Sequence, residues 1–247
     1  MIRNNVRLIS ALAGATAVLA VSASSAGAAT NLGETFDPPS MCGTNTTYLV
    51  TNSVGDAYTV PFNGVISSWS FQTGSLAPEI VRLKVGRVIP GSDLSAVQTD
   101  LSITGESISQ VPSASSLNSF PTRVPVKQGD FLGIFLGGDG SVQCSDAGSS
   151  AGYRDHYSDS EVLAGSSATF TGESDGQIEV AAVLEPDADQ DGFGDETQDQ
   201  CPSDPATRGQ CPVAPVTTVT KKKCKKKKKH HSADSAKKKK CKKKKRG

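Results

Sequence analysis

Apolar and polar residues alternate with a period of two over most of the chain, from about residue 31 to residue 184. Residues 81–85, for example, read Val-Arg-Leu-Lys-Val, and similar alternation occurs at 123–126 and 178–184. Such a pattern is typical of strands with one face on a core and the other in water. Because the spacing typical of helices is absent, we expect an all-β domain in which Lys84 and Glu179 face solvent.

Further strand candidates lie between clusters of Gly, Pro, Asn, Asp and Ser. These are 47–52, 57–60, 65–71, 131–136 and 168–171. The run 131–136 is apolar on both faces, which predicts a central strand. Short strands at this density favour an antiparallel β-sandwich of the jelly-roll type, with a closed barrel as the alternative. We expect its core to contain Trp69, Phe71, Phe131, Ile134 and Phe135.

The first 29 residues have the pattern of a secretory signal peptide. Arg3 and Arg7 precede an apolar, Ala-rich run, and Ala26-Gly27-Ala28 supplies the small residues of a cleavage site. A membrane anchor is the alternative. No later run approaches the ~18 apolar residues of a spanning helix. We therefore expect a secreted protein with four parts: 1–29 signal peptide, 30–185 sandwich, 186–212 acidic loop, and 213–247 linker and basic tail.

Six cysteines in an exported chain predict disulfides, which persist in oxidising compartments. Four of them precede the tail, and four cysteines allow three pairings. We prefer Cys42 with Cys144, closing a long loop, and Cys201 with Cys211, forming a local bridge. The remaining two, Cys224 and Cys241, lie among lysines, whose charge favours reactive thiolates. We expect them to form a disulfide with each other or between chains.

An acidic loop follows the last predicted strand and has the composition of a Ca²⁺ site. Aspartates at 187, 189 and 191 are followed by Gly192 and by Asp195 and Asp199. Ca²⁺ takes six to eight oxygen ligands from such flexible loops. We expect the side chains of Asp187, Asp189 and Asp191, the carbonyl of Phe193, and Asp195 and Asp199 to be ligands, with Gly192 permitting the bend. The alternative is a solvated acidic hinge without an ion.

The spacing departs from that of an EF-hand, because Gln198 stands where the bidentate glutamate of the twelfth position belongs. With Cys201-Pro202 behind the aspartates, residues 187–202 instead resemble the type 3 repeat of thrombospondins. From Asp195 to Asp199 the spacing is one residue longer than the usual pattern. The layout as a whole is similar to that of secreted bacterial proteins of uncharacterised function. The resemblance implies a structural Ca²⁺ site and no activity.

The near-neutral net charge of +1 hides two oppositely charged parts. Residues 30–220 hold seven basic against 24 acidic residues, whereas residues 221–247 hold sixteen lysines and one arginine against one aspartate. So dense a basic run predicts disorder and salt-dependent binding to polyanions. We expect anionic cell-surface polymer or lipid headgroups as partners. The tail has no aromatic residue for base stacking, which disfavours nucleic acid.

Two weaker motifs define the alternatives for function. Gly148-Ser149-Ser150-Ala151-Gly152 matches the nucleophile elbow of hydrolases, but it lacks the strand-turn-helix context, and His156 follows too closely. Residues 153–159 form a polar and aromatic cluster of the kind that binds sugars, and the alternative is an exposed strand with paired charges. We therefore expect a non-enzymatic Ca²⁺-binding surface or adhesion-type protein. The first alternative is a carbohydrate-binding module, recognising glycan near Trp69 or residues 153–159, and the second is an esterase-like hydrolase.

Overall fold

The computed structural model describes residues 28–147 and 152–213, and over these ranges the protein is built of antiparallel β-strands and one short 3₁₀ turn, η1 (Val54–Asp56). This confirms the all-β antiparallel class. The strands are β1 (Thr30–Glu34), β2 (Ser40–Gly43), β3 (Thr46–Asn52), β4 (Gly64–Gln72), β5 (Ile80–Val88), β6 (Thr99–Glu106), β7 (Leu117–Val126), β8 (Phe131–Gly137), β9 (Ser141–Ala147), β10 (Arg154–Ser158), β11 (Ser167–Phe170), β12 (Gly172–Ser174), β13 (Gly176–Ile178) and β14 (Val180–Pro186).

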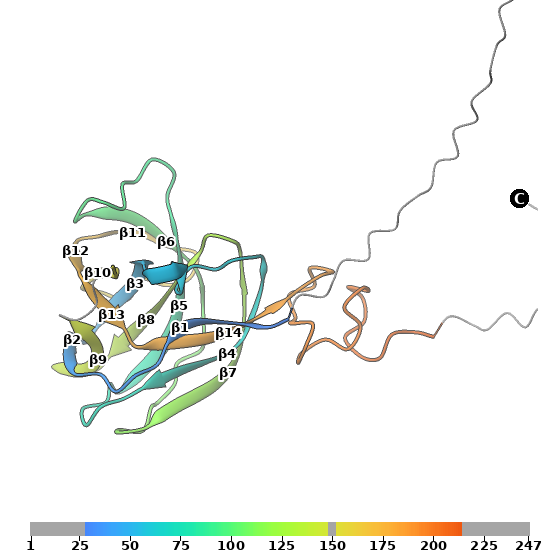
Figure 1. Ribbon diagram of the computed structural model, residues 1–247, viewed down its shortest axis with the longest axis horizontal. Helices are drawn as coiled ribbons and strands as arrows, with labels where there is room; N and C mark the ends of the chain where they lie inside the picture. Colours follow the sequence, from blue (N-terminus) through green and yellow to red (C-terminus); the bar gives the residue numbers. More distant parts are fainter. Residues whose placement is uncertain (1–27, 148–151, 214–247) are drawn as a thin grey trace, which may run out of the picture. The chain divides into compact units, whose positions relative to one another are not determined.

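The strands form three sheets, which Figure 1 shows gathered in one domain. One sheet has the order β1-β14-β4-β7, and a small one has the order β13-β9-β2. The largest has the order β11-β6-β5-β8-β3-β10-β12. Its two outer strands, β11 and β12, are consecutive stretches of one segment, so this sheet curls into a nearly closed, barrel-like form. We call Thr30–Pro186 the β domain.

Two apolar clusters occupy opposite faces of the curled sheet. The larger joins side chains of the four-stranded sheet, such as Trp69 and Phe71, to side chains of the curled sheet, such as Leu83 and Ile134. The smaller consists of Leu49, Leu101, Ile103, Val162 and Phe170. Leu49 lies between Tyr48 and Val50 of the larger cluster, as alternation along a strand requires.

All five predicted core residues are buried, and the predicted central strand is confirmed. Every residue of β8 is buried, and β8 lies between β5 and β3. An aromatic pair extends the core, because Trp69 lies 4.9 Å from Phe120, measured between ring centroids. The sequence therefore located the strand that holds the curled sheet together.

The expectation that Lys84 faces water is wrong. Its side chain is 0% exposed, because the curled sheet encloses the face of β5 opposite the main core. The ammonium pairs with Glu106 and, at 3.1 Å, with Glu161, and it donates to the carbonyl of Val162 at 3.0 Å. Burial of a lysine requires such partners, since an unpaired ammonium in the interior is costly.

Glu179 is also buried, contrary to expectation, and it interrupts the predicted strand 178–184 between β13 and β14. A third difference concerns residues 57–60, which form no strand and contribute one isolated bridge, Thr59 with Phe131. The structure adds strands that the pattern did not indicate, among them β6 and β9. Period-two alternation therefore located the central strands better than the peripheral ones.

Both preferred disulfides are present. Cys42 of β2 bonds Cys144 of β9, with Cα atoms 5.8 Å apart, and joins neighbouring strands of the small sheet. Cys201 bonds Cys211, with Cα atoms 4.8 Å apart. We call residues 201–211 the stapled peptide. Cross-links of this kind stabilise a fold by about 2–4 kcal/mol, mainly through the unfolded chain, and they fit an oxidising environment.

The β7 edge of the four-stranded sheet lies next to the acidic loop. Two of the ten residues of β7 are prolines, Pro121 and Pro125, which have no N–H to donate. The carbonyl of Thr122 accepts a hydrogen bond of 2.8 Å from the side-chain amide of Gln198. The chain divides between Cys211 and Pro212, so the acidic loop belongs with the strands. No helix among the described residues is long and apolar enough to span a membrane.

Candidate metal site

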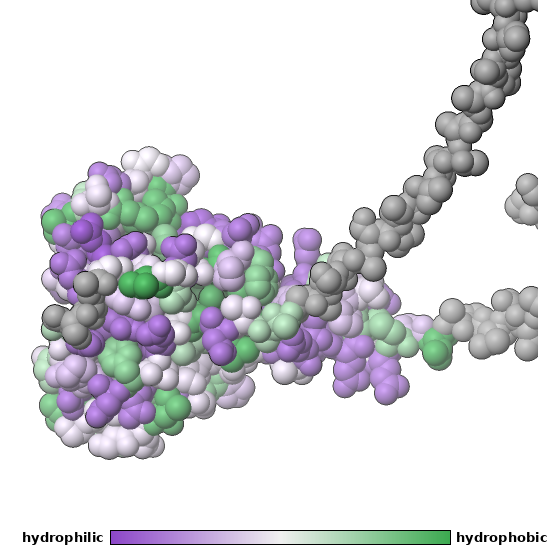
Figure 2. Space-filling model, in the orientation of Figure 1, coloured by the Kyte–Doolittle hydropathy of each residue, from purple (hydrophilic) through white to green (hydrophobic). Residues whose placement is uncertain are grey.

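The acidic loop, residues 187–199, begins directly after β14, and we call it the metal loop. Figure 2 shows that hydrophilic residues dominate the visible surface of this part of the chain. Glu185, which is 1% exposed, holds the loop against the strand. Its carboxylate accepts from the backbone N–H groups of Glu196 (3.1 Å) and Thr197 (2.9 Å) and from the Thr197 hydroxyl (2.6 Å). Burial raises the pKa of Glu185, but these hydrogen bonds and one with Ser67 outweigh it and lower the pKa below its usual value.

Two glycines allow the chain to turn this tightly. Gly192 has φ +83°, a left-handed conformation that other residues rarely adopt. Gly194 lies so close to Glu185 that a Cβ on it would come within 2.4 Å of the carboxylate oxygen Oε2. The loop therefore wraps around the anchoring carboxylate at a position where only glycine fits.

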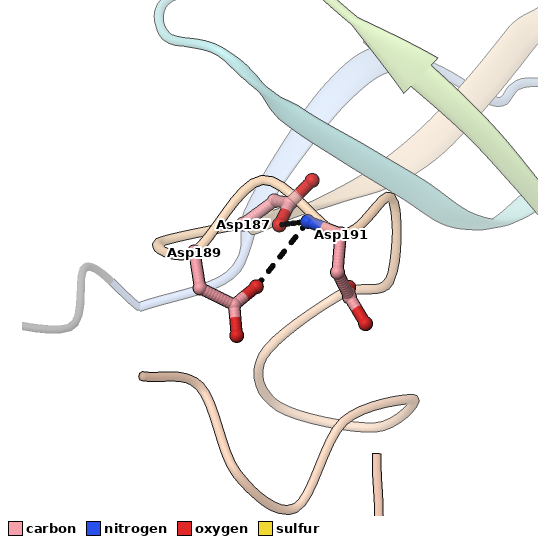
Figure 3. Close-up of side chains that lie close together, drawn as sticks. All are labelled: Asp187, Asp189 and Asp191. Carbon is pink, nitrogen blue, oxygen red and sulfur yellow. Dashed lines mark hydrogen bonds between the residues drawn. The ribbon is translucent and has the colours of Figure 1, made fainter. Parts of the chain in front are cut away.

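Asp187, Asp189 and Asp191 converge, as predicted, with one oxygen of each within 4.8 Å of the others. Figure 3 shows the hydrogen bonds that arrange them: the Asp191 N–H donates to Asp187 (3.1 Å) and to Asp189 (3.2 Å). The Gly192 N–H also donates to Asp187, at 3.0 Å, and the Phe193 N–H donates to Asp191, at 2.9 Å. Each of the three carboxylates is thus oriented by the loop's own backbone.

Asp195 and Asp199 complete the acidic group without belonging to the triad of convergent oxygens. The Asp195 carboxylate accepts from the N–H of Ala188 at 3.2 Å and closes the loop on itself. Asp199 is 3% exposed and accepts from the N–H of Cys201 at 2.8 Å. Burial raises the pKa values of Asp189 and Asp195, and the negative charge of neighbouring aspartates, Asp199 included, adds to both shifts.

Three of the five aspartates have a buried carboxylate oxygen with no hydrogen-bond partner: Oδ2 of Asp189, of Asp191 and of Asp199. Oδ2 of Asp191 forms an ion pair with Arg208, whose Nε lies 3.5 Å away. Buried polar atoms are nearly always satisfied, so such a group requires an explanation. A Ca²⁺ ion is chemically suited to these oxygens, because it binds carboxylates drawn from one loop. The residues present therefore fit the ion.

Phe193 has a second role that the sequence did not indicate. Its ring contacts two guanidinium groups, Arg123 of β7 at 4.1 Å and Arg208 of the stapled peptide at 3.7 Å, measured to the ring centroid. Cation–π contacts of this kind contribute about 0.5–1 kcal/mol each at exposed sites. The ring thus connects the metal loop to both the strand before it and the peptide behind it.

Gln198, which stands where an EF-hand has its bidentate glutamate, has a different role in this loop. Its side chain donates to the Thr122 carbonyl of β7 and accepts from the Gly194 N–H at 3.3 Å, so it secures the loop. Among the residues that sequence reasoning missed, Glu185, Arg123 and Arg208 support the loop. Of these three, only Glu185 could be recognised in the sequence, since a Glu-Pro pair directly before an acidic loop marks the end of a strand.

The residues of the alternative functions lie elsewhere. Trp69 is 1% exposed, so its ring cannot stack on a sugar at the surface. His156 is buried in β10, with Nδ1 2.8 Å from the Thr51 hydroxyl and Nε2 3.1 Å from the Ala96 carbonyl. Ser150 lies outside the described residues, as do the signal peptide, Cys224, Cys241 and the basic tail.

Comparison with family models, curated proteins and solved structures finds no match to this chain. Function is therefore argued from the geometry alone.

Proposed function

We propose that this is a secreted, non-enzymatic Ca²⁺-binding protein of the surface or adhesion type. The convergent triad of Asp187, Asp189 and Asp191 carries this proposal, together with buried carboxylate oxygens of Asp189 and Asp199 that have no hydrogen-bond partner among the described residues. In it, Asp187, Asp189 and Asp191 bind the ion through their side chains and Phe193 through its carbonyl, with Asp195 and Asp199 completing the acidic shell, as in type 3 thrombospondin repeats. We interpret the β domain as a sandwich of the jelly-roll type, because one apolar cluster joins its four-stranded and curled sheets.

In this proposal the ion's contribution is structural. Bound Ca²⁺ supplies positive charge that offsets five aspartates within one short loop, whose mutual repulsion otherwise disfavours the folded loop. Hydrogen bonds within the chain position the loop. Glu185 accepts from the N–H groups of residues 196 and 197, Gln198 donates to β7, and the Cys201 N–H donates to Asp199. The loop thereby becomes a stiff joint between the β domain and the residues that follow.

The test is Ca²⁺ titration of the mature chain, followed by calorimetry and thermal melting. An ion at 100 times its Kd stabilises a protein by about 2.7 kcal/mol, which corresponds to a rise in Tm of roughly 5–10 °C for a domain of this size. The double variant Asp189→Asn with Asp191→Asn keeps the side-chain shapes and removes two charges. We expect it to lose Ca²⁺ binding and the Tm shift.

A matched control removes two charges away from the loop, Asp139→Asn with Asp159→Asn, both of which are exposed. The control should keep the full Ca²⁺ response. An unchanged Tm in Ca²⁺, or an equal response from the loop variant and the control, contradicts the proposal.

The basic tail, residues 221–246, supplies the proposed attachment to anionic cell-surface polymer or lipid. Its lysines release counterions on binding, so the affinity falls steeply with salt and does not depend on the sequence of the partner. Retention of the mature protein on anionic wall polymer should be complete at low salt and lost at high salt. Retention that survives high salt contradicts this assignment.

Carbohydrate binding is the second candidate, and one observation favours it. A cleft of about 510 Å³ lies beside β10 and is lined by Tyr153, Arg154, Asn52 and Asp175, among others. Aromatic, cationic and amide side chains together suit a sugar. A glycan array with the mature chain tests it, with Tyr153→Ala as the matched variant. Binding that Tyr153→Ala removes, and that does not depend on Ca²⁺, supports this function over the first.

A further inference from the structure

A cleft lies between the metal loop and the strands beside it. It has a volume of about 690 Å³. Asp187, Gln190 and Asp191 line its loop side, and Arg87, Lys127 and Asn63 line its strand side. Pro125, which is exposed, adds apolar surface. No step of the proposed structural role of Ca²⁺ requires this space.

The strand side of the cleft presents hydrogen-bond donors that no described residue occupies. Lys127 is exposed, and its ammonium group pairs with no described carboxylate. Arg87 uses Nε and Nη2 on Asp130, at 2.6 and 2.5 Å, which leaves Nη1 available on a side chain that is 38% exposed. Asn63 accepts through Oδ1 from the Gln128 N–H at 2.9 Å, which leaves its NH₂ group free.

This inventory restricts the ligand. Lysine and arginine side chains only donate, and the free group of Asn63 also donates. Asp130 also lines the cleft and already pairs with Arg87, so Lys127 is the cation of this wall that has no carboxylate partner among the described residues. A ligand that satisfies the free donors must be rich in acceptors and must carry negative charge opposite Lys127.

The loop side requires oxygen as well. Asp187 and Asp191 both line the cleft and belong to the proposed Ca²⁺ site, so an ion held there lies at the cleft wall. Ca²⁺ accepts hydroxyl and carbonyl oxygens among its six to eight ligands. A ligand that carries hydroxyls at one end and a carboxylate at the other meets both walls, and the C–H face of a sugar ring suits the exposed ring of Pro125.

We propose that this cleft binds the uronic acid units of an acidic glycan, with the sugar carboxylate at Lys127 and Arg87 and sugar hydroxyls at the Ca²⁺ side. The proposal rests on the proposed Ca²⁺ site. The acidic glycan would be the surface partner of the β domain. It differs from the polyanion bound by the tail, because recognition of the glycan depends on Ca²⁺ and on one cleft of the size of a sugar ring.

The experiment is calorimetric titration of the mature chain with glucuronic acid at buffered free Ca²⁺ and in chelator. We expect binding in Ca²⁺ and at least tenfold weaker binding in chelator. Because coupling between two sites is reciprocal, saturating glucuronic acid should tighten Ca²⁺ binding by the same factor. The methyl ester of glucuronic acid keeps the hydroxyls and loses the charge, so it should bind at least tenfold more weakly.

Lys127→Gln is the variant that tests the cleft, since the side chain is exposed and its replacement leaves no buried group unpaired. We expect at least a tenfold loss of glucuronic acid affinity with unchanged Ca²⁺ affinity in the absence of sugar. Asp159→Asn, an exposed substitution away from both clefts, is the control and should bind as the unaltered chain does.

The outcomes separate the two proposals. Ca²⁺ binding without glucuronic acid binding, or equal sugar binding by Lys127→Gln, overturns the cleft assignment and leaves the metal site intact. Preference for glycerol phosphate over glucuronic acid overturns the carboxylate assignment in favour of a phosphate polymer. Absence of Ca²⁺ binding overturns both.

Discussion

Buried carboxylates occur in two settings in this protein. In the β domain, Asp155 and Glu179 are each 0% exposed, and each has one carboxylate oxygen without a partner. Neither belongs to a cluster of carboxylates, although the charge of Asp175 adds to the raised pKa of Asp155. In the metal loop, Asp189, Asp191 and Asp199 also have buried oxygens without a hydrogen-bond partner, but they lie in one cluster with Asp187 and Asp195.

The buried negative charge is neutralised differently in the two settings. Burial raises the pKa of Glu179 to about 10 and that of Asp155 to about 7, so a single proton can neutralise each isolated group. Five aspartates in one short loop would need several protons, whereas one divalent cation balances two charges and binds oxygens of several residues at once. Proton-dependent stability should therefore belong to the β domain and Ca²⁺-dependent stability to the loop.

The largest expected effect concerns Glu179. Its pKa is raised from 4.5 to about 10, so the folded protein holds a proton that the unfolded chain releases. The free energy of unfolding should fall by about 1.4 kcal/mol per pH unit from this group between about pH 5 and 10. Glu179→Gln, which mimics the protonated carboxyl, should remove that slope and stabilise the protein at pH 8. Urea unfolding at a series of pH values measures it.

Glu79→Gln is the control for this variant, since Glu79 is exposed, and it should leave the slope unchanged. If Glu179→Gln destabilises the protein at pH 8, Glu179 is ionised in the fold, and the contrast between the two settings fails.

Deprotonation of Asp155 should also lower the free energy of unfolding as the pH rises, over a narrower pH range than that of Glu179. The pKa of Asp155 is raised from 3.8 to about 7, mainly by burial, so its contribution to stability is complete below pH 4 and lost by about pH 7. Asp155→Asn keeps an acceptor for the Ser174 hydroxyl. It should flatten the stability profile between pH 4 and 7 and leave the profile above pH 7 parallel to that of the unaltered protein. A flattening equal to that of exposed Asp159→Asn contradicts this.

The smallest effect concerns the ring that connects the loop to its neighbours. Phe193→Leu removes contacts with Arg123 and Arg208 and should cost about 1–2 kcal/mol in total. Because these contacts order the loop before the ion binds, Ca²⁺ affinity should weaken several-fold. Phe193→Tyr keeps the ring and should restore both values, as thermal melting and Ca²⁺ titration can measure. Equal behaviour of the two variants would assign the ring no role beyond filling space.

Local features of the fold were accessible from the sequence. The apolar run of β8, the core position of Trp69 and the pairing of Cys201 with Cys211 each depend on neighbours in the chain. Lys84 and Glu179 were misplaced because alternation shows which residues share a face and cannot show that a second layer covers it. Strand β10 was an alternative for residues 153–159, but the sequence indicated an exposed strand for the same reason, and Asp155 and His156 are buried by tertiary structure.

In the candidate site, too, the features set by neighbours in the chain could be predicted and those set by tertiary structure could not. Convergence of Asp187, Asp189 and Asp191 follows from their spacing around Gly192, so it could be predicted. The burial of Asp199 depends on the stapled peptide, whose Cys201 N–H holds it, and the approach of Arg208 to Asp191 depends on the same peptide. Neither contact has a sequence signal. The cleft at Lys127 joins residues from six separate segments and could be found only in three dimensions.

The way Gln198 binds the Thr122 carbonyl has a consequence for solubility. An open sheet edge invites a strand from another molecule, and such pairing leads to aggregation. On β7, two prolines withhold N–H groups, and Gln198 occupies one of the carbonyls that an incoming strand would need. Many copies held side by side on one surface could therefore stay separate, because the metal loop also caps the edge at which they would polymerise.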